Sequence, residues 1–173
     1  MQIGEEPERS GLVDTPRRAA AFWKDFIEYD AGNIDTRFQL HNAGSLVVVS
    51  PIRVYSLCEH HLLPFWCDVS IVYKPVEQTV IGLSKFARIA NKAAHRLQVQ
   101  ERLTYEIGYE VMQHTKSPHV AVIAKGVHLC MVMRGIRTSA QTITTFFHGD
   151  FTHGLQSDIY ALIESMKQPM QFE

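Results

Sequence analysis

The sequence has few cysteines, no long apolar run and no excess of charge of either sign. Its three cysteines, in 173 residues, are an odd and sparse set that argues against a disulfide framework and favours reduced thiols in the cytoplasm. No apolar stretch approaches the ~20 residues of a membrane helix, and the acidic, polar start does not resemble a signal peptide. A net charge of -1 offers no electrostatic footprint for nucleic acid or an anionic membrane. We therefore expect a cytoplasmic protein that holds any anionic ligand through a local cluster of basic residues.

Length and composition predict one globular domain over residues 1–173. Hydrophobic residues make up 46% and charged residues 20%, which are ordinary values for a chain that buries a core. No repeat, low-complexity tract or Pro/Gly/Ser-rich linker divides the chain. We expect a short N-terminal helix at about 15–31 and a core at about 45–165.

The hydrophobic patterns predict an α+β fold. Thr15 as N-cap, Pro16 in the first helical position and Gly32 as a stop signal delimit the first helix. Alternation from Phe65 to Tyr73 predicts a strand with one buried face, and Pro51 suggests an edge or a bulge in the strand before it. We expect strands at 45–56, 65–75, 119–136 and 137–149, and further helices at 83–97, 99–115 and 157–169, with Ser84 as the cap of the first of these.

The segment "SLCEHHLLPF" sets reactive side chains against an apolar run. Cys58 and His61 are three residues apart, so on one helical turn they face the same way while His60 points elsewhere. A thiolate and an imidazole can hold two corners of a zinc tetrahedron. The best third ligand is Cys130, which we expect on one strand face with His128, and continued alternation adds Arg134 to that face.

Two cysteines and one histidine would leave the fourth zinc position open, as in catalytic sites. His60 and His128 would then be unliganded imidazoles placed for proton transfer. The alternative is that isolated buried cysteines and histidines only pack in the core, which is our interpretation of Cys67. Spacing alone does not decide between these possibilities for the other residues.

Two further segments carry polar groups at helix starts. Lys85 and Arg88 are three residues apart where a helix begins, an arrangement that suits an anion but also an ordinary solvated face. In "QVQERLT", Glu101 is placed either to cap a helix or to accept paired hydrogen bonds from an amidine-like edge such as that of guanine.

Four segments, "SLCEHHLLPF", "VIGLSKFARI", "RLQVQERLT" and "VHLCMVMRGI", closely resemble the signature motifs of the zinc-dependent GTP cyclohydrolase I family. The resemblance runs from about residue 11 to residue 151. It implies the tunnelling fold, in which antiparallel sheets backed by helices join between subunits into a barrel, and a toroidal homodecamer of two pentamers. It also implies the conversion of GTP to 7,8-dihydroneopterin triphosphate with loss of formate, beginning with attack of a zinc-activated water on guanine C8.

The resemblance assigns a role to each matching residue. Zinc would be bound by Cys58, His61 and Cys130, and protons would be moved by His60 and His128. Glu101 with Gln100 would hold the guanine edge. The ribose and triphosphate would face the remaining polar residues, Ser84, Lys85, Arg88, Arg134 and, from the "TPRRAA" segment of a neighbouring subunit, Arg18.

The sequence departs from the family pattern in three places. A basic residue common in the family is replaced by Ala21, so one phosphate contact is expected to be missing, and a usual glycine is replaced by Cys67. The segment before "GLVDTP" is short, which argues against partners that use an N-terminal extension. A nitrile reductase of the same fold, with a nucleophilic cysteine, and a non-catalytic zinc-binding homologue are the alternatives. The complete zinc and proton-transfer set argues against both.

Overall fold

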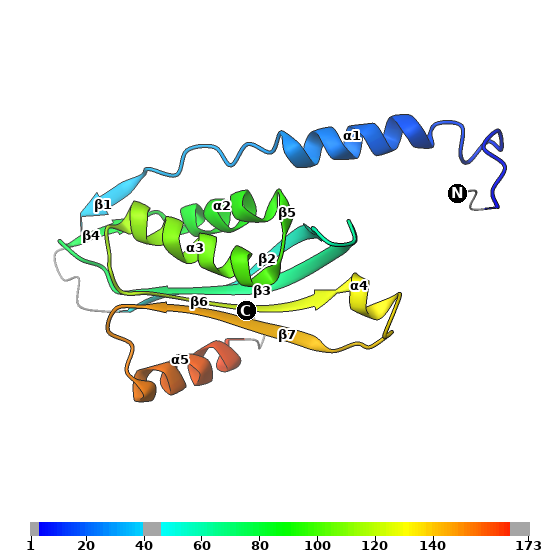
Figure 1. Cartoon of the computed structure of the whole chain (residues 1–173). Coiled ribbons are helices and arrows are strands. Elements are labelled where there is room, and N and C mark those ends of the chain that lie inside the picture. Colours follow the sequence, from blue (N-terminus) through cyan, green and yellow to red (C-terminus); the bar gives the residue numbers. More distant parts are fainter. Residues whose placement is uncertain (1–3, 40–45, 167–173) are drawn as a thin grey trace, which may run out of the picture. The chain divides into compact units, whose positions relative to one another are not determined.

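A computed structural model describes residues 4–39 and 46–166 of the chain (Figure 1). The chain divides into two compact units, Met1–Asp30 and Ala31–Glu173. Within the described residues, no helix is both long and apolar enough to cross a membrane.

The first unit contains one amphipathic helix, α1 (Thr15–Ile27). Its N-cap is Asp14, one residue before the predicted cap, and a proline lies in the first turn as expected. The helix ends at Ile27, five residues before the predicted stop at Gly32, because the apolar periodicity that could support another turn also ends there. Phe22 and Phe26 stack with their ring centroids 6.0 Å apart, yet Phe22 remains half exposed.

The second unit is built on a five-stranded sheet with the order β5-β2-β3-β6-β7. All pairings are antiparallel except that of β2 with the short β5. The register shifts between Val49 and Ile52, which confirms a bulge at Pro51. A separate two-stranded sheet pairs β1 (Arg37–Gln39) with β4 (Thr79–Ile81). The five strands are β2 (Val47–Cys58), β3 (Pro64–Tyr73), β5 (Leu97–Gln98), β6 (Val120–His128) and β7 (Gln141–His148).

Helices cover both faces of this sheet. On one face lie α2 (Leu83–Ala94) and α3 (Gln100–Thr115), and on the other lies α5 (His153–Ser165) (Figure 1). The buried face predicted for β3 is confirmed, since Phe65, Cys67, Val69, Ile71 and Tyr73 are all buried in the core beneath α2 and α3. The opposite face, predicted to be more polar, is also buried at Ser70 and Val72, and Val72 packs with residues of α5. The last helix begins four residues earlier than predicted, and residues 167–169 of the prediction lie outside the described part.

Two further local predictions were wrong. The strand expected to run through Cys130 ends at His128, and Cys130 lies instead in the short helix α4 (Leu129–Val132). Because the pair Phe65–His128 is the last one between β3 and β6, no partner strand continues beyond it and the chain turns. Cys130 and Arg134 therefore do not share a strand face with His128. The second error concerns Ser84, which is inside α2; the N-cap of that helix is Gly82.

Candidate metal centre and active site

The proposed metal ligands meet at the end of β2. Cys58 is the last residue of that strand, and the following turn is closed by hydrogen bonds from the amides of His61 and Leu62 to the Cys58 carbonyl, at 3.3 and 2.8 Å. This turn brings His61 Nδ1 to 3.7 Å from Cys58 Sγ. With Cys130 from α4, the three ligand atoms all lie within 4.8 Å of one another. Zinc bonds of 2.0–2.3 Å imply ligand separations of roughly 3.5–3.8 Å, a range that the Cys58–His61 separation meets and that the others exceed by at most about 1 Å.

Burial and charge at the three ligands favour a cation. Burial raises the pKa of the Cys130 thiol, and the neighbouring Cys58 thiol raises it further. Two adjacent thiolates are therefore unfavourable unless a positive ion lies between them. Among the described residues, no fourth His, Cys, Asp or Glu joins the group. The arrangement corresponds to a metal with one open coordination position.

The two adjacent histidines of the turn are separated by geometry. The side chain of His60 is 65% exposed, and its ring lies edge-on to that of His61 with centroids 6.1 Å apart. His60 Nδ1 is 4.0 Å from Cys58 Sγ but does not belong to the ligand group. The structure thus places His61 in the candidate metal site and His60 beside it.

His128 is held rigidly from two sides. Its ring stacks on Phe65, with centroids 4.6 Å apart and an interplanar angle of 12°. Its Nε2 lies 2.8 Å from Oε1 of Gln100, whose amide nitrogen donates to the carbonyls of Ala124 and Thr142, both at 3.0 Å. Since those carbonyls can only accept, Gln100 Oε1 must accept from His128 Nε2–H. His128 Nδ1 is then the nitrogen that can take up a proton, and burial lowers the pKa of this imidazole.

Gln100 differs from its sequence-based prediction. It was expected to help hold the guanine edge, but it is almost completely buried and its side-chain amide bonds to β6, β7 and His128. Its neighbour Glu101 is exposed in the first turn of α3, and its charge acts on His128. Glu101 therefore lies near His128, at the end of the sheet that holds the candidate metal ligands. Gln100 instead holds the His128 ring through a hydrogen bond from inside the fold.

The space for the Gln100 amide depends on a glycine. Gly126 on β6 pairs with Cys67 on β3, and a Cβ at this position would lie 2.3 Å from Gln100 Oε1 and 2.7 Å from Cys67 Sγ. The unusual Cys67 is accommodated because its partner has no side chain. Burial raises the pKa of the Cys67 thiol to about 12, so this cysteine is inert at neutral pH.

Sequence reasoning gave no role to Glu59 and Arg102, although both stand inside the motifs it singled out. Arg102 Nη2 lies 2.5 Å from Glu59 Oε2, and this hydrogen bond lowers the pKa of the carboxyl group. The only signal in the sequence was the position of each residue, Glu59 between two reactive side chains and Arg102 next to Glu101.

The predicted phosphate-binding residues do not gather at the metal. Ser84, Lys85 and Arg88 lie in the first turns of α2, whereas the far end of this helix leads to β5, which pairs with Cys58. A helix of 12 residues spans about 18 Å, so Ser84 and Lys85 lie at the end of α2 away from Cys58, whereas Arg88 lies about midway along the helix (Figure 1). Lys85 Nζ donates to the Asn33 carbonyl at 2.8 Å, and Arg88 Nη1 donates to the Ala31 carbonyl at 2.5 Å.

The other two predicted phosphate ligands have different surroundings. Arg134 follows α4 and its positive charge acts on Cys130, which places it near the metal ligands. Arg18 lies on α1 in the first unit, 3.6 Å from Asp14. A single unit of the chain therefore supplies only part of the predicted basic cluster.

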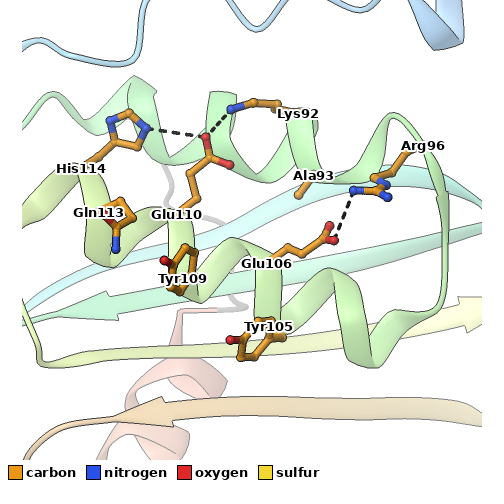
Figure 2. Close-up of a pocket in the computed structure, with 9 residues that line it drawn as sticks. All are labelled: Lys92, Ala93, Arg96, Tyr105, Glu106, Tyr109, Glu110, Gln113 and His114. Atoms are coloured by element: carbon orange, nitrogen blue, oxygen red, sulfur yellow. Dashed lines mark hydrogen bonds and ion pairs between the residues drawn. The ribbon is translucent and has the colours of Figure 1, made fainter.

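A pocket between α2 and α3 is separate from this site (Figure 2). Its charged residues pair with one another, since Lys92 binds Glu110, which also approaches His114, and Arg96 lies 3.3 Å from Glu106. A larger cavity of about 1060 Å³ lies on the sheet face that carries α5. Neither cavity is lined by a candidate metal ligand.

The sequence comparisons agree with the site. The family model for GTP cyclohydrolase I matches residues 1–164. The chain belongs to the GTP cyclohydrolase I family. Among its relatives named GTP cyclohydrolase 1, that of Hyperthermus butylicus is 49% identical over 165 residues, covering 94% of this chain and 84% of the relative. That of Sulfurihydrogenibium is 45% identical over 150 residues, covering 86% and 80%. Members of the family are hydrolases that convert GTP to dihydroneopterin triphosphate.

A solved structure supports the fold. The archaeosine synthase QueF-Like in its apo form matches with a TM-score of 0.54 and 19% identity, covering 64% of this chain and all of that one. This likeness confirms the tunnelling fold for this chain. It lends no support to the nitrile reductase alternative, which needs a nucleophilic cysteine. Cys58 and Cys130 lie in the metal group, and Cys67 is fully buried with a strongly raised pKa.

Proposed function

We propose that this chain hydrolyses and rearranges GTP to 7,8-dihydroneopterin triphosphate, with release of formate, at a zinc site made by Cys58, His61 and Cys130. The observation that carries this proposal is the convergence of these three ligand atoms within 4.8 Å, beside two imidazoles that are not ligands. When bound, zinc supplies Lewis acidity at an open coordination position.

The two unliganded histidines have complementary tasks in this proposal. His128, which donates from Nε2 to Gln100, accepts or returns a proton at Nδ1 while the imidazole ring of the base opens. His60 is exposed at the other side of the metal turn and exchanges protons with solvent as formate leaves. The stacking of His128 on Phe65 keeps its ring orientation constant through these transfers.

Recognition of GTP is divided between the base and the phosphates. Glu101, exposed at the start of α3, accepts hydrogen bonds from N1–H and the 2-amino group of guanine. The ribose and the triphosphate are held by the remaining set, Ser84, Lys85, Arg88, Arg134 and Arg18. Because Ser84 and Lys85 lie about one α2 length from the metal ligands of their own chain, and Arg88 is bonded to the Ala31 carbonyl, we assign these three residues to the site of a neighbouring subunit.

A site whose residues come from different chains requires an oligomer. We propose a homodecamer of two pentamers, in which the whole chain acts as one catalytic domain. Two sheet edges favour it. β7 is the last strand of the sheet, and the opposite edge strand, β5, pairs with β2 only at Leu57 and Cys58. Unpaired strand edges are stabilised when subunits join them into a closed barrel. Light scattering should give ten chains of 19.7 kDa, about 197 kDa.

The activity is tested by incubating purified, zinc-loaded protein with GTP and following pterin fluorescence and formate. Both products should appear together, stop after chelation and return with zinc. His61→Ala is the matched control, because it removes an exposed ligand without disturbing the core. A zinc-loaded protein that consumes no GTP would overturn the proposal. We also propose that the protein is cytoplasmic and that its product enters folate-type biosynthesis.

A further inference from the structure

The side chain of Arg102 connects three segments near the metal ligands. Its Nη2 lies 2.5 Å from Glu59 Oε2 and 2.8 Å from the Leu97 carbonyl oxygen, and its Nε donates to Gln98 Oε1 at 2.8 Å. Glu59 stands between Cys58 and His60 in the metal turn, residues 58–61. Arg102 therefore joins the metal turn to β5 and to the first turn of α3.

Backbone pairing joins the same segments. Leu57 and Cys58 at the end of β2 pair with β5, and the Glu59 amide donates to the Gln98 carbonyl at 3.0 Å. This backbone pairing ends at Glu59, and beyond it the metal turn is held by its own hydrogen bonds and by the Glu59 carboxylate. The second oxygen of that carboxylate is 4.0 Å from His60 Nε2.

We propose that Arg102 is a positioning residue, which holds Glu59 so that the metal turn has its metal-binding geometry before the ion arrives. Two ligands come from this turn and the third from α4, a separate element, so any freedom of the turn must be lost when the metal binds. Removing that freedom in advance increases metal affinity. The inference rests on the metal site of the proposed function and adds a residue that never touches the metal.

The Arg102–Glu59 contact also links the proposed guanine-binding residue, Glu101, to the metal turn. Glu101 precedes Arg102 in the first turn of α3, so a movement of the metal turn relative to this helix would also separate Glu101 from the metal. The Arg102–Glu59 contact thereby fixes the relative positions of the guanine-binding carboxylate and the reacting end of the site.

An ordinary surface ion pair would contribute little, and this pair is about one-third exposed, with side-chain exposures of 36% and 34%. Arg102 differs because it also binds a main-chain carbonyl and a buried glutamine. The pair Lys92–Glu110 provides a matched control. It joins α2 to α3 (Figure 2) and has side-chain exposures of 52% and 23%, and both residues lie outside the segments that Arg102 connects.

The test measures zinc affinity by chelator competition and the visible spectrum of the Co²⁺-substituted protein. Arg102→Leu should weaken zinc binding 10- to 100-fold and alter the thiolate–cobalt bands, whereas Lys92→Leu should change neither. Arg102→Lys keeps the charge and one donor and should recover part of the affinity. Glu59→Gln should weaken binding as well, and the double variant should lose less than the sum of the two changes.

Unchanged zinc affinity in a folded Arg102→Leu protein would overturn the inference and leave the proposed function intact. An equal loss in Lys92→Leu would also overturn it, because the effect would then reflect general stability. A wild-type protein that binds neither zinc nor cobalt would instead reject the metal site, and the proposed function with it. Circular dichroism identifies any variant that has not folded, in which case Glu59→Gln supplies the same comparison.

Discussion

The metal half and the phosphate half of the candidate site are built in different ways. Cys58, His61 and Cys130 converge within one unit of one chain, and His128, two residues before Cys130, is fixed by a hydrogen bond and by ring stacking. Lys85, near the start of α2, and Arg88, midway along it, instead bond to the main-chain carbonyls of Asn33 and Ala31. Metal ligation depends on ligand distances within a few tenths of an ångström, whereas attraction between a triphosphate and basic side chains acts over longer distances. The demanding chemistry is thus placed where paired strands end, and the proposed assembly would supply the part that tolerates longer distances.

The largest effect is expected from breaking the metal half. Cys130→Ser should lose zinc and about 10³-fold or more of the activity, because a neutral hydroxyl is a poor zinc ligand. Elemental analysis and the pterin assay measure the two losses. Cys67→Ser is the control and should keep its zinc, since Cys67 is not in the ligand group. Full zinc content in Cys130→Ser would show that the ligand assignment is wrong.

The next effect separates ligation from proton transfer inside the metal half. His60→Ala should keep its zinc and lose roughly 10²-fold in kcat, the usual contribution of a positioned acid or base. His61→Ala should lose the metal. If the two variants lose zinc in parallel, the roles of the adjacent histidines have been assigned incorrectly.

A smaller effect is expected from the support beneath His128. Gln100→Leu should lower kcat on the order of 10-fold, with little change in KM for GTP, because His128 loses the partner that fixes its protonated nitrogen. The free energy of unfolding should fall by about 1–3 kcal/mol, since two strand carbonyls lose their donor. A raised KM with unchanged kcat would show that Gln100 contacts the base after all.

Subunit mixing tests whether the two halves come from different chains. Cys58→Ser lacks a metal half and Lys85→Ala lacks a phosphate half, so random mixed oligomers should recover about one quarter of wild-type activity. The matched control mixes Cys58→Ser with Cys130→Ser and should recover none, because every metal half is defective. No recovery in the first mixture, despite subunit exchange shown by mass spectrometry, would place both halves in one chain.

The smallest effect concerns Cys67. Because burial raises its pKa from 9.0 to about 12, the thiol should resist iodoacetamide at pH 8 until the protein is unfolded. The folded state holds the proton more tightly than the unfolded state. Its contribution to stability is therefore complete below pH 9 and is lost as the pH rises towards 12. Denaturant titrations should show a shallower alkaline loss for Cys67→Ser. Rapid labelling of the native thiol would contradict its burial.

The parts of the fold that could be predicted are those with a strong period. The two-residue alternation of β3 and the buried side of α3 are visible in the sequence because one face of each element packs on the core. The end of β6 could not be predicted from the sequence. The run "LCMVM" suits a strand or a helical turn equally well, and only the lack of a partner strand after Phe65–His128 decides it.

The candidate site, like the fold, has a part that could be predicted from the sequence and a part that could not. The group Cys58, His61 and Cys130 could be predicted, the first two from their spacing on one turn and Cys130 from its side-chain chemistry and the family resemblance. The task of Gln100 could not be predicted, since it depends on carbonyls of β6 and β7 that lie 24 and 42 residues away in the chain. Contacts between distant backbone atoms leave no local pattern in the sequence.

The pairing of Cys67 with Gly126 has a consequence for how this family can vary. Three groups share one fixed volume under His128: the Cys67 sulfur, the Gln100 amide oxygen and the hydrogen of Gly126. Enlarging position 126 alone would push the amide away from the imidazole, and shrinking position 67 alone would leave a void. Substitutions at these two positions should therefore arise together in homologous sequences, and a designer who alters one must choose the other at the same time.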